Sequence, residues 1–438
     1  MEISAGDTAW LLVSTALVML MTPGLALFYG GMVQGKNVLS TYMHSFLALG
    51  LISVQWALLG YTLAFAPTHH GLIGGLDFLG LEGVGTDGAG RTVPHLLFMM
   101  YQGMFAIITP ALISGAFAER MKLSAYVLFT LLWATLVYDP VAHWVWGPGG
   151  WLGKRGALDF AGGTVVHWAS GISALVVAIV LGKRTGYPSR AHVPHDLTMT
   201  VLGAGLLWFG WFGFNAGSAL TSGGLSSLAL VNTHMAAATG ALAWVVIEAF
   251  RMKKATMLGV ASGLVAGLVG ITPAAGFVEP RAAMLIGVLA GVACYGGVML
   301  KSRLGYDDAL DAFGVHGVGG AAGALLTGVF ASATLTADHH GGSLARVGEQ
   351  ALALAAVGAW AVIVTYGLLK LIDATVGLRV DRETEYDGLD GALHGERAYS
   401  MGEGGGGHHP PAPAAHAHPA AAHARRGVDG EPDEAFGT

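Results

Sequence analysis

Residues 311–320 read DAFGVHGVGG and place His316 in a run made almost entirely of Gly, Val, Ala and Phe. Residues 158–171 read LDFAGGTVVHWASG and place His167 in similar surroundings. A buried polar group without a hydrogen-bond partner costs roughly 2–7 kcal/mol. Both rings therefore need an explanation, and the rest of the chain supplies the setting in which to look for it.

The composition indicates a membrane protein. Apolar residues make up 53% of the 438 residues and charged residues only 11%, against about 25% charged residues in soluble domains. The 68 glycines suit close helix packing in a bilayer. The single cysteine, Cys294, excludes disulfides within the chain and cysteine-based metal sites. Nothing in the sequence resembles a basic nucleic-acid-binding patch.

A membrane span needs about 20 mostly apolar residues, and eleven stretches meet that requirement. No Lys or Arg precedes Lys36, so the first stretch is interpreted as a retained span and not as a signal peptide. The expected spans are 8–30, 42–66, 95–118, 124–146, 162–182, 198–216, 226–248, 257–276, 282–300, 309–330 and 346–372.

Basic residues are distributed unequally between the two sets of loops. One set carries Lys36, Arg120, Lys122, Lys183, Arg184, Arg190, Arg251, Lys253, Lys254, Lys301 and Arg303; the other carries Arg91, Lys154, Arg155, Arg281 and Arg346. The positive-inside rule then predicts that the N-terminus lies outside and the C-terminus in the cytoplasm.

Short repeated tags indicate an inverted repeat. ITPA occurs at 108–111 and again at 271–274, and VH occurs at 166–167 and again at 315–316. Each tag lies five predicted spans from its twin, and an odd shift reverses the direction through the membrane. We therefore expect an all-α polytopic membrane protein of eleven transmembrane helices, in which spans 1–5 and 6–10 form an inverted repeat around a central pore and span 11 is extra.

The same repeat relates the two histidines. Asp159 precedes span 5 on one side, and Asp311 opens span 10 on the other. Because the two segments enter from opposite faces, we expect His167 and His316 to meet near the middle of the membrane. The alternative is two unrelated core histidines, each bonded to a backbone carbonyl. A metal site would need three or four ligands, and no third ligand is near, so the pattern favours a His-lined pore for a small polar or protonatable solute.

Aromatic residues occur within span 3 and at the outer ends of spans 4 and 6. They include Phe105 in span 3, Trp146 at the end of span 4 and Phe214 at the end of span 6, where Ser218 follows. An interfacial aromatic belt accounts for such residues. A cation cage accounts for them equally well, because an aromatic face attracts a cation by about 0.5–2 kcal/mol and a Ser hydroxyl can accept an N–H bond.

These segments resemble the ammonium transporter family (Amt/Mep/Rh), in particular its bacterial Amt branch. The resemblance covers about residues 1–400 and rests on motifs in the family's order: YQGMFAIITPALISGAFAERM, DFAGGTVVH, WFGFNAGSA, GLVGITPAAG, DAFGVHGVGG and VGLRVDRETEYDGLDGALHGERAY. Three regions follow: a transmembrane transport domain over 1–375, a cytoplasmic regulatory tail over 376–399, and a disordered Gly/His/Pro/Ala-rich tail over 400–438, whose histidines could alternatively bind metal.

The resemblance implies a role for each candidate residue. Recruitment of the ammonium ion is assigned to Trp146, Ser218 and Phe105, and the gate to the stacked rings of Phe105 and Phe214. His167 and His316 would line the pore, with Asp159 as a structural carboxylate that supports recruitment.

The resemblance also implies the activity and its setting. The protein would carry ammonium or ammonia, with methylammonium as a second candidate, across the cytoplasmic membrane as a homotrimer without cofactor or metal. A PII-type nitrogen regulatory protein would bind the cytoplasmic face. The chain is not expected to be an enzyme. The alternative function is an ammonium sensor that signals through the PII-type partner with little net transport.

Overall fold

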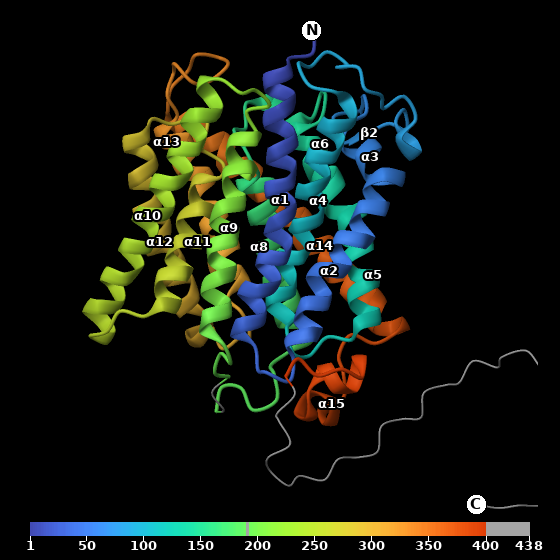
Figure 1. Ribbon diagram of the computed structural model, residues 1–438, viewed down its shortest axis with the longest axis vertical. Helices are drawn as coiled ribbons and strands as arrows, with labels where there is room; N and C mark the ends of the chain where they lie inside the picture. The colour runs from blue at the N-terminus through green and yellow to red at the C-terminus, as the bar shows by residue number, and fades with distance from the viewer. Residues whose placement is uncertain (190–191, 400–438) are drawn as a thin grey trace, which may run out of the picture. The chain divides into compact units, whose positions relative to one another are not determined.

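Long apolar runs become long helices, because only helices and closed barrels satisfy every backbone N–H and C=O within a bilayer. The computed structural model describes residues 1–189 and 192–399, which form the helical bundle shown in Figure 1. Within this part of the chain, ten helical segments are long and apolar enough to cross a membrane. The predicted polytopic all-α fold is confirmed; the tail expected over 400–438 lies outside the described residues.

Six spans are single helices, and the others are interrupted by wider π-helical turns. The single helices are α1 (Ala5–Met32), α4 (His95–Phe117), α9 (Leu197–Gly217), α10 (Gly224–Met252), α12 (Pro280–Leu304) and α14 (Leu344–Thr375). Span 2 comprises α2 (Val38–Gln55), η1 (Trp56–Gly60) and α3 (Tyr61–Phe65). Span 4 comprises α5 (Leu123–Trp133), η3 (Ala134–Tyr138) and α6 (Asp139–Trp146), with α7 (Trp151–Arg155) after a turn.

The two histidine-bearing spans share one construction. Each starts with a π-helical turn that carries the histidine and continues as an α-helix. The first consists of η4 (Gly163–Trp168) and α8 (Ala169–Leu181), the second of η5 (Phe313–Gly317) and α13 (Val318–Phe330). The small elements are β1 (Thr68–His69), β2 (Ile73–Gly74), η2 (Leu79–Leu81), α15 (Arg382–Asp387) and η6 (Asp390–His394).

The eighth expected span is shorter than its sequence suggested. Residues 257–276 are helical only as α11 (Met257–Ile271), which falls below the length of the other spans. The chain then turns at Thr272 and Pro273, where proline disfavours helical backbone at the residue before it. The equivalent Pro110 stays inside α4. Eleven apolar segments are thus compatible with the structure, ten of them of full span length.

Helices α1 and α9, the first members of the two repeats, pack along each other. The histidine-bearing spans approach even more closely. A Cβ atom at Gly171 would lie 2.1 Å from the backbone nitrogen of Gly317, so only glycine fits at this crossing. We call the end of the bundle at which α1 begins the amino end, and the end at which α15 lies the carboxyl end (Figure 1).

The segment 376–399 packs on the carboxyl end of its own bundle. The Asp390 carboxylate accepts the backbone N–H groups of Leu39 and Ser40 at 3.0 and 2.8 Å, at the start of α2. The N–H of Leu389 donates to the side chain of Asn37 at 2.8 Å. Asn37 in turn donates to Glu119 at 3.0 Å.

Glu119 belongs to a buried ionic cluster that links the tail to the helices. Arg184 bridges Glu119 at 2.7 Å and Asp307 at 2.9 Å. Burial opposes the charge on Glu119, but hydrogen bonds from His192 and the nearby Arg184 guanidinium outweigh it and lower the pKa of that carboxyl. Arg184 likewise holds the pKa of Asp307 below its ordinary value despite burial. The charged tail therefore lies against the bundle end, connected to it by buried polar contacts.

Candidate functional site

His167 and His316 meet inside the bundle. Their Nδ1 atoms are 3.2 Å apart, and the two rings are nearly parallel at a centroid distance of 5.3 Å. Both residues are buried, with 2% and 4% of their surface exposed. The repeat therefore brings together the two rings that the sequence placed in separate apolar runs. Among the described residues, no group of three or more His, Cys, Asp or Glu side chains is placed to hold a metal ion.

The backbone turn at each histidine is what aims the ring. The N–H groups of Val166 and His167 both reach the carbonyl of Gly162 at 2.9 Å, so the helix is locally widened to a π-turn. Such turns recur at functional sites because they displace one side chain from the regular helical position. The Nε2 atom of His167 is buried and has no hydrogen-bond partner among the described residues. A donor or acceptor is thus left available within the bundle.

The histidine pair lines a narrow apolar lumen. Its cavity volume is only about 10 Å³, which is about the smallest volume that holds one water molecule. The wall contains Trp211, whose ring stacks on His167 at a centroid distance of 5.4 Å. The other lining residues are Met21, Leu25, Phe28, Ile108, Leu112, Leu207, Phe214, Val265 and His316.

Two stacked phenylalanine rings separate this lumen from the amino end. Phe105 of α4 and Phe214 of α9 lie 4.2 Å apart between ring centroids, inclined by 28°. Phe214 lines the lumen, and Phe105 lines a larger cavity on the other side. The two rings to which the family resemblance assigns the gate therefore form one partition.

The larger cavity, which we call the amino vestibule, has a volume of about 400 Å³. It contains Trp146 and Ser218 with Phe105, the three residues expected to recruit a cation. The Trp146 ring meets Phe105 edge to face at 6.0 Å. The Ser218 hydroxyl donates to the carbonyl of Phe214 at 2.9 Å, so its lone pairs can accept a hydrogen bond from a bound molecule.

Sequence reasoning missed two residues of the amino vestibule region. The Tyr101 hydroxyl lies 3.2 Å from the Ser218 oxygen and 2.9 Å from the carbonyl of Gly213, so it braces the end of α9. Arg91 lines the vestibule with its guanidinium 3.9 Å from the centroid of the Phe98 ring. The Tyr101 contacts join residues more than 100 positions apart along the chain, so no local pattern signals them. Arg91 contacts a ring only seven residues further on, but no local pattern shows that it lines the vestibule.

Asp159 fixes the entrance to the first histidine turn. Its two carboxylate oxygens accept the backbone N–H groups of Gly162, Gly163, Thr164 and Val165 at 2.7–3.0 Å. Its backbone carbonyl accepts the indole N–H of Trp146 at 2.8 Å. Burial raises the pKa of Asp159, and the four N–H groups act in the opposite direction. One residue thus orients both the histidine turn and the vestibule tryptophan.

The counterpart of Asp159 in the second repeat is Asp308, and not Asp311, which opens span 10 in the sequence. Asp308 accepts the N–H groups of Ala312 and Phe313 at 3.1 and 2.8 Å, at the start of η5. Asp311 has a left-handed backbone, with φ of 61°, and its carboxylate turns away to Lys301 at 2.6 Å. The signal was present in the sequence: Asp159 and Asp308 each precede their histidine by eight residues.

Comparisons with known proteins agree with this architecture. The model of the Ammonium Transporter Family matches residues 9–399. An ammonium transporter of Bacillus subtilis (strain 168) is 54% identical over 401 residues, covering 90% of this chain and 98% of that protein.

Solved structures give the same picture. Candida albicans Mep2 superposes with a TM-score of 0.83 at 38% identity, covering 87% of this chain and 88% of that one. A structure described as a sensor Amt protein superposes with a TM-score of 0.84 at 29% identity, covering 89% of this chain and 98% of that one.

The two aspartates provide a test of this geometry. Asp159→Ala leaves four buried N–H groups without their acceptor, and each such group costs about 1–3 kcal/mol. Asp308→Ala leaves two. We expect Asp159→Ala to lower the thermal unfolding midpoint of the detergent-purified protein clearly more than Asp308→Ala does, and Asp159→Asn to lie between wild type and Asp159→Ala. An equal or larger loss in Asp308→Ala would contradict the prediction.

Proposed function

The chain belongs to the ammonium transporter family, and on that premise we propose that it binds the ammonium ion in the amino vestibule, removes a proton and conducts ammonia past the histidine pair. The observation that carries this proposal is the order of spaces along the bundle. A vestibule of about 400 Å³ is followed by the Phe105–Phe214 partition, a lumen of about 10 Å³ at the histidines, and a cavity of about 170 Å³ beyond His316.

The narrow lumen favours a neutral permeant over an ion. Taking an ammonium-sized charge out of water costs several kcal/mol even after the protein relaxes, and the lumen has room for about one water molecule. Neutral ammonia avoids that cost. His167 and His316 give it hydrogen-bonding partners without a fixed charge, and a ring pair at 3.2 Å can hold and pass a proton. A carboxylate in the same place would hold the cation instead of releasing it.

The amino vestibule suits the recruitment step. Trp146 and Phe105 present aromatic surface to a cation, and the Ser218 oxygen has lone pairs for an N–H group. The hydrogen bond from the Trp146 indole to Asp159 holds the ring in place. The aromatic rings and the hydroxyl would therefore bind the ion weakly enough for it to leave again.

We place the amino end outside and the carboxyl end in the cytoplasm of the cell membrane, because the loops at the carboxyl end carry the larger number of Lys and Arg residues. The family resemblance supports a homotrimer with one pore in each subunit. It also supports a PII-type partner at the carboxyl end, where the segment 376–399 packs.

An ammonium sensor is the second candidate function. The structural similarity to a sensor Amt protein favours it as an alternative. The two functions differ in their consequences for cells. A deletion strain with normal ammonium uptake and faulty nitrogen signalling would favour the sensor, whereas lost uptake at low ammonium would favour the transporter.

A series of buried polar contacts connects the segment 376–399 to the turn that carries His316. Leu389 bonds to Asn37, Asn37 to Glu119, and Arg184 joins Glu119 to Asp307. Asp307 is followed in the chain by Asp308, which caps the turn that carries His316. A contiguous chain of buried polar contacts is the kind of connection through which docking at one end can bias another site. We infer that the tail regulates conduction along this route.

His167→Ala and His316→Ala should each lower ammonium uptake by at least about tenfold, since positioned proton-transfer groups typically contribute 10²–10⁴-fold. The measurement is uptake at low ammonium in cells that lack other ammonium carriers, with each variant quantified in the membrane. His234→Ala is the control, because His234 stacks on Trp208 and is not among the lumen-lining residues. Wild-type uptake in either pore variant would remove the histidine pair from the mechanism.

Trp146→Leu should raise the half-saturating ammonium concentration by about tenfold, equivalent to about 1.4 kcal/mol, with a smaller change in maximal rate. The reason is the loss of an aromatic face worth about 0.5–2 kcal/mol to a cation. Trp360→Leu is the matched control: Trp360 is 37% exposed on α14 and outside the vestibule. An unchanged half-saturating concentration in Trp146→Leu would favour the aromatic-belt interpretation.

Asp390→Ala removes the acceptor for two N–H groups at the start of α2 and should weaken the contact between the tail and the bundle. We expect a lower maximal uptake rate, because the tail is proposed to regulate conduction. The half-saturating concentration should stay unchanged, because Asp390 does not line the amino vestibule. Glu383→Gln, an exposed change on α15, is the control. Truncation after Met401, which lies outside the described residues, should leave uptake near wild type. Equal uptake in Asp390→Ala and Glu383→Gln would argue against regulation through this contact.

A further inference from the structure

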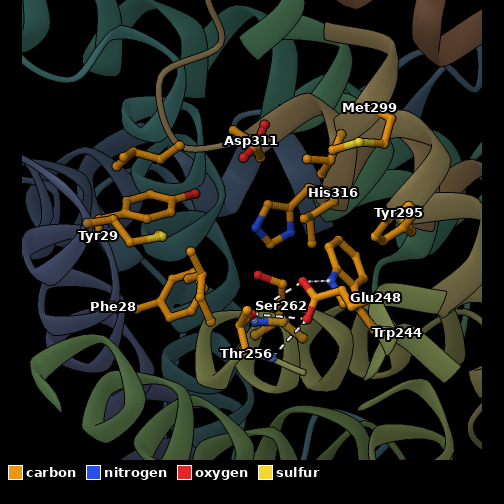
Figure 2. A pocket seen from close by; sticks show the side chains of 18 of the residues that line it. Phe28, Tyr29, Trp244, Glu248, Thr256, Ser262, Tyr295, Met299, Asp311 and His316 are labelled. Carbon is orange, nitrogen blue, oxygen red and sulfur yellow. Dashed lines mark hydrogen bonds between the residues drawn. The ribbon is translucent and has the colours of Figure 1, made fainter. Parts of the chain in front are cut away.

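A second sizeable cavity lies beyond His316, and Figure 2 shows the side chains that line it. Its volume of about 170 Å³ has room for several water molecules or for one small ion with part of its hydration shell. His316, Phe28 and Val265 line both this cavity and the lumen. A permeant that passes the histidines therefore enters this space next. We call it the carboxyl cavity.

The Glu248 carboxylate stands in the wall of the carboxyl cavity, across from His316 (Figure 2). Glu248 is 7% exposed. It accepts the backbone N–H of Thr256 at 3.1 Å, the Thr256 hydroxyl at 3.0 Å and the indole N–H of Trp244 at 3.3 Å. A Cβ atom at Gly259 would lie 2.2 Å from the carboxylate, so glycine at that position makes room for it.

The negative charge of Glu248 has no ionic partner in the described part of the chain. None of the ion pairs there includes this carboxylate. The other acidic residue of the cavity, Asp311, is paired with Lys301 at 2.6 Å. Buried charges are ordinarily paired or used. Glu248 is therefore the carboxylate in this cavity that can still take a cation.

The hydrogen bonds at the start of α11 do not by themselves require a charged acceptor. Thr256 already caps α11 with its own hydroxyl, which accepts the N–H of Gly259 at 2.9 Å. A glutamine could accept hydrogen bonds from Thr256 and Trp244 through its amide oxygen, without the cost of burying a charge. The carboxylate lies at the start of α11, where the helix dipole favours a negative charge, so the charge can be held there without a cationic side chain.

The surroundings of Glu248 suit a small monovalent cation with N–H donors. The rings of Phe28 and Trp244 and the Ser262 side chain lie around the same space (Figure 2). The guanidinium of Arg251 lies over the Tyr295 ring, 5.8 Å from its centroid, and forms no ion pair with the Glu248 carboxylate. A carboxylate, aromatic surface and a hydroxyl are the groups that hold an ammonium-like ion.

We propose that Glu248 forms a second cation-binding site, in the carboxyl cavity, for the ammonium ion that re-forms beyond the histidine pair. The identity of the ion rests on the proposed function; the existence of a monovalent-cation site does not. The site differs in strength from that in the amino vestibule, because it uses a full negative charge where the vestibule uses neutral groups. It sets the affinity for ammonium on the carboxyl side alone.

The direct test is crystallographic and uses thallium(I), a heavy monovalent cation, as its acetate in chloride-free buffer. Wild-type crystals should show an anomalous peak in the carboxyl cavity within bonding distance of the Glu248 carboxylate, and Glu248→Gln crystals should lose it. The absence of a wild-type peak there, a peak at Asp311 instead, or a peak that survives in Glu248→Gln would each overturn the proposal. The wild-type measurement stands whether or not the variant folds.

The functional test compares the two directions of transport in proteoliposomes with one known protein orientation. Glu248→Gln should raise the half-saturating ammonium concentration for movement from the carboxyl side by roughly tenfold, the order expected for one lost charge-assisted hydrogen bond. The value from the amino side should stay unchanged. Glu383→Gln is the charge-matched control at the same end of the bundle. Equal shifts from both sides would overturn the proposal. Absence of ammonium transport in the wild type would refute the proposed function while leaving the thallium result to decide the site.

Discussion

The arrangement of the pore depends on the Asp159 carboxylate and its four backbone N–H bonds. The start of a helix leaves N–H groups without intrahelical partners, and lipid or packed protein offers them no water. Asp159 satisfies four of them at once and thereby holds the π-turn that aims His167. Its carbonyl holds the Trp146 indole. The vestibule and the histidine are consequently positioned by the same residue, and neither can shift without the other.

In the second repeat, which enters from the opposite end, an aspartate also accepts the free N–H groups at the start of the histidine turn, but it accepts fewer of them. Asp308 satisfies two N–H groups of the turn that carries His316, and the ionic cluster of Glu119, Arg184 and Asp307 supports the segment before it. Because the two turns enter from opposite ends, their rings meet where both chains are farthest from water. Gly171 permits the close crossing that this meeting requires. The two halves therefore differ in what anchors their histidine turns, and the segment 376–399 packs at the end of the bundle that holds the anchor of the second half.

Much of this could be predicted from the sequence, and the limits have physical causes. The spans follow from apolar length, and the meeting of His167 with His316 follows from the repeat, because both are properties of the chain read locally. Asp311 opens span 10 in the sequence, but a left-handed turn at that residue sends its side chain to Lys301. The end of α11 depends on Pro273, whose equivalent Pro110 does not break α4. Tyr101 was missed because its contacts reach across the bundle to α9, which no local pattern encodes. Glu248 was missed because its hydrogen bonds are local and do not show that it lines a cavity together with His316.

The ionisable side chains are distributed unevenly along the series of cavities from the amino end to the carboxyl end. In the lumen the ionisable groups are the two histidines, which can exchange a proton without carrying a permanent charge. Carboxylates appear just before each histidine turn, where backbone N–H groups occupy Asp159 and Asp308 and keep them from competing for the permeant. Beyond the lumen, the carboxyl cavity is lined by Glu248, which has no ionic partner among the described residues, and by Asp311, which is paired with Lys301. On the proposed function, ammonia passes the lumen as a neutral molecule and the ammonium ion occupies the cavities at both ends, so each form meets polar groups that stabilise it.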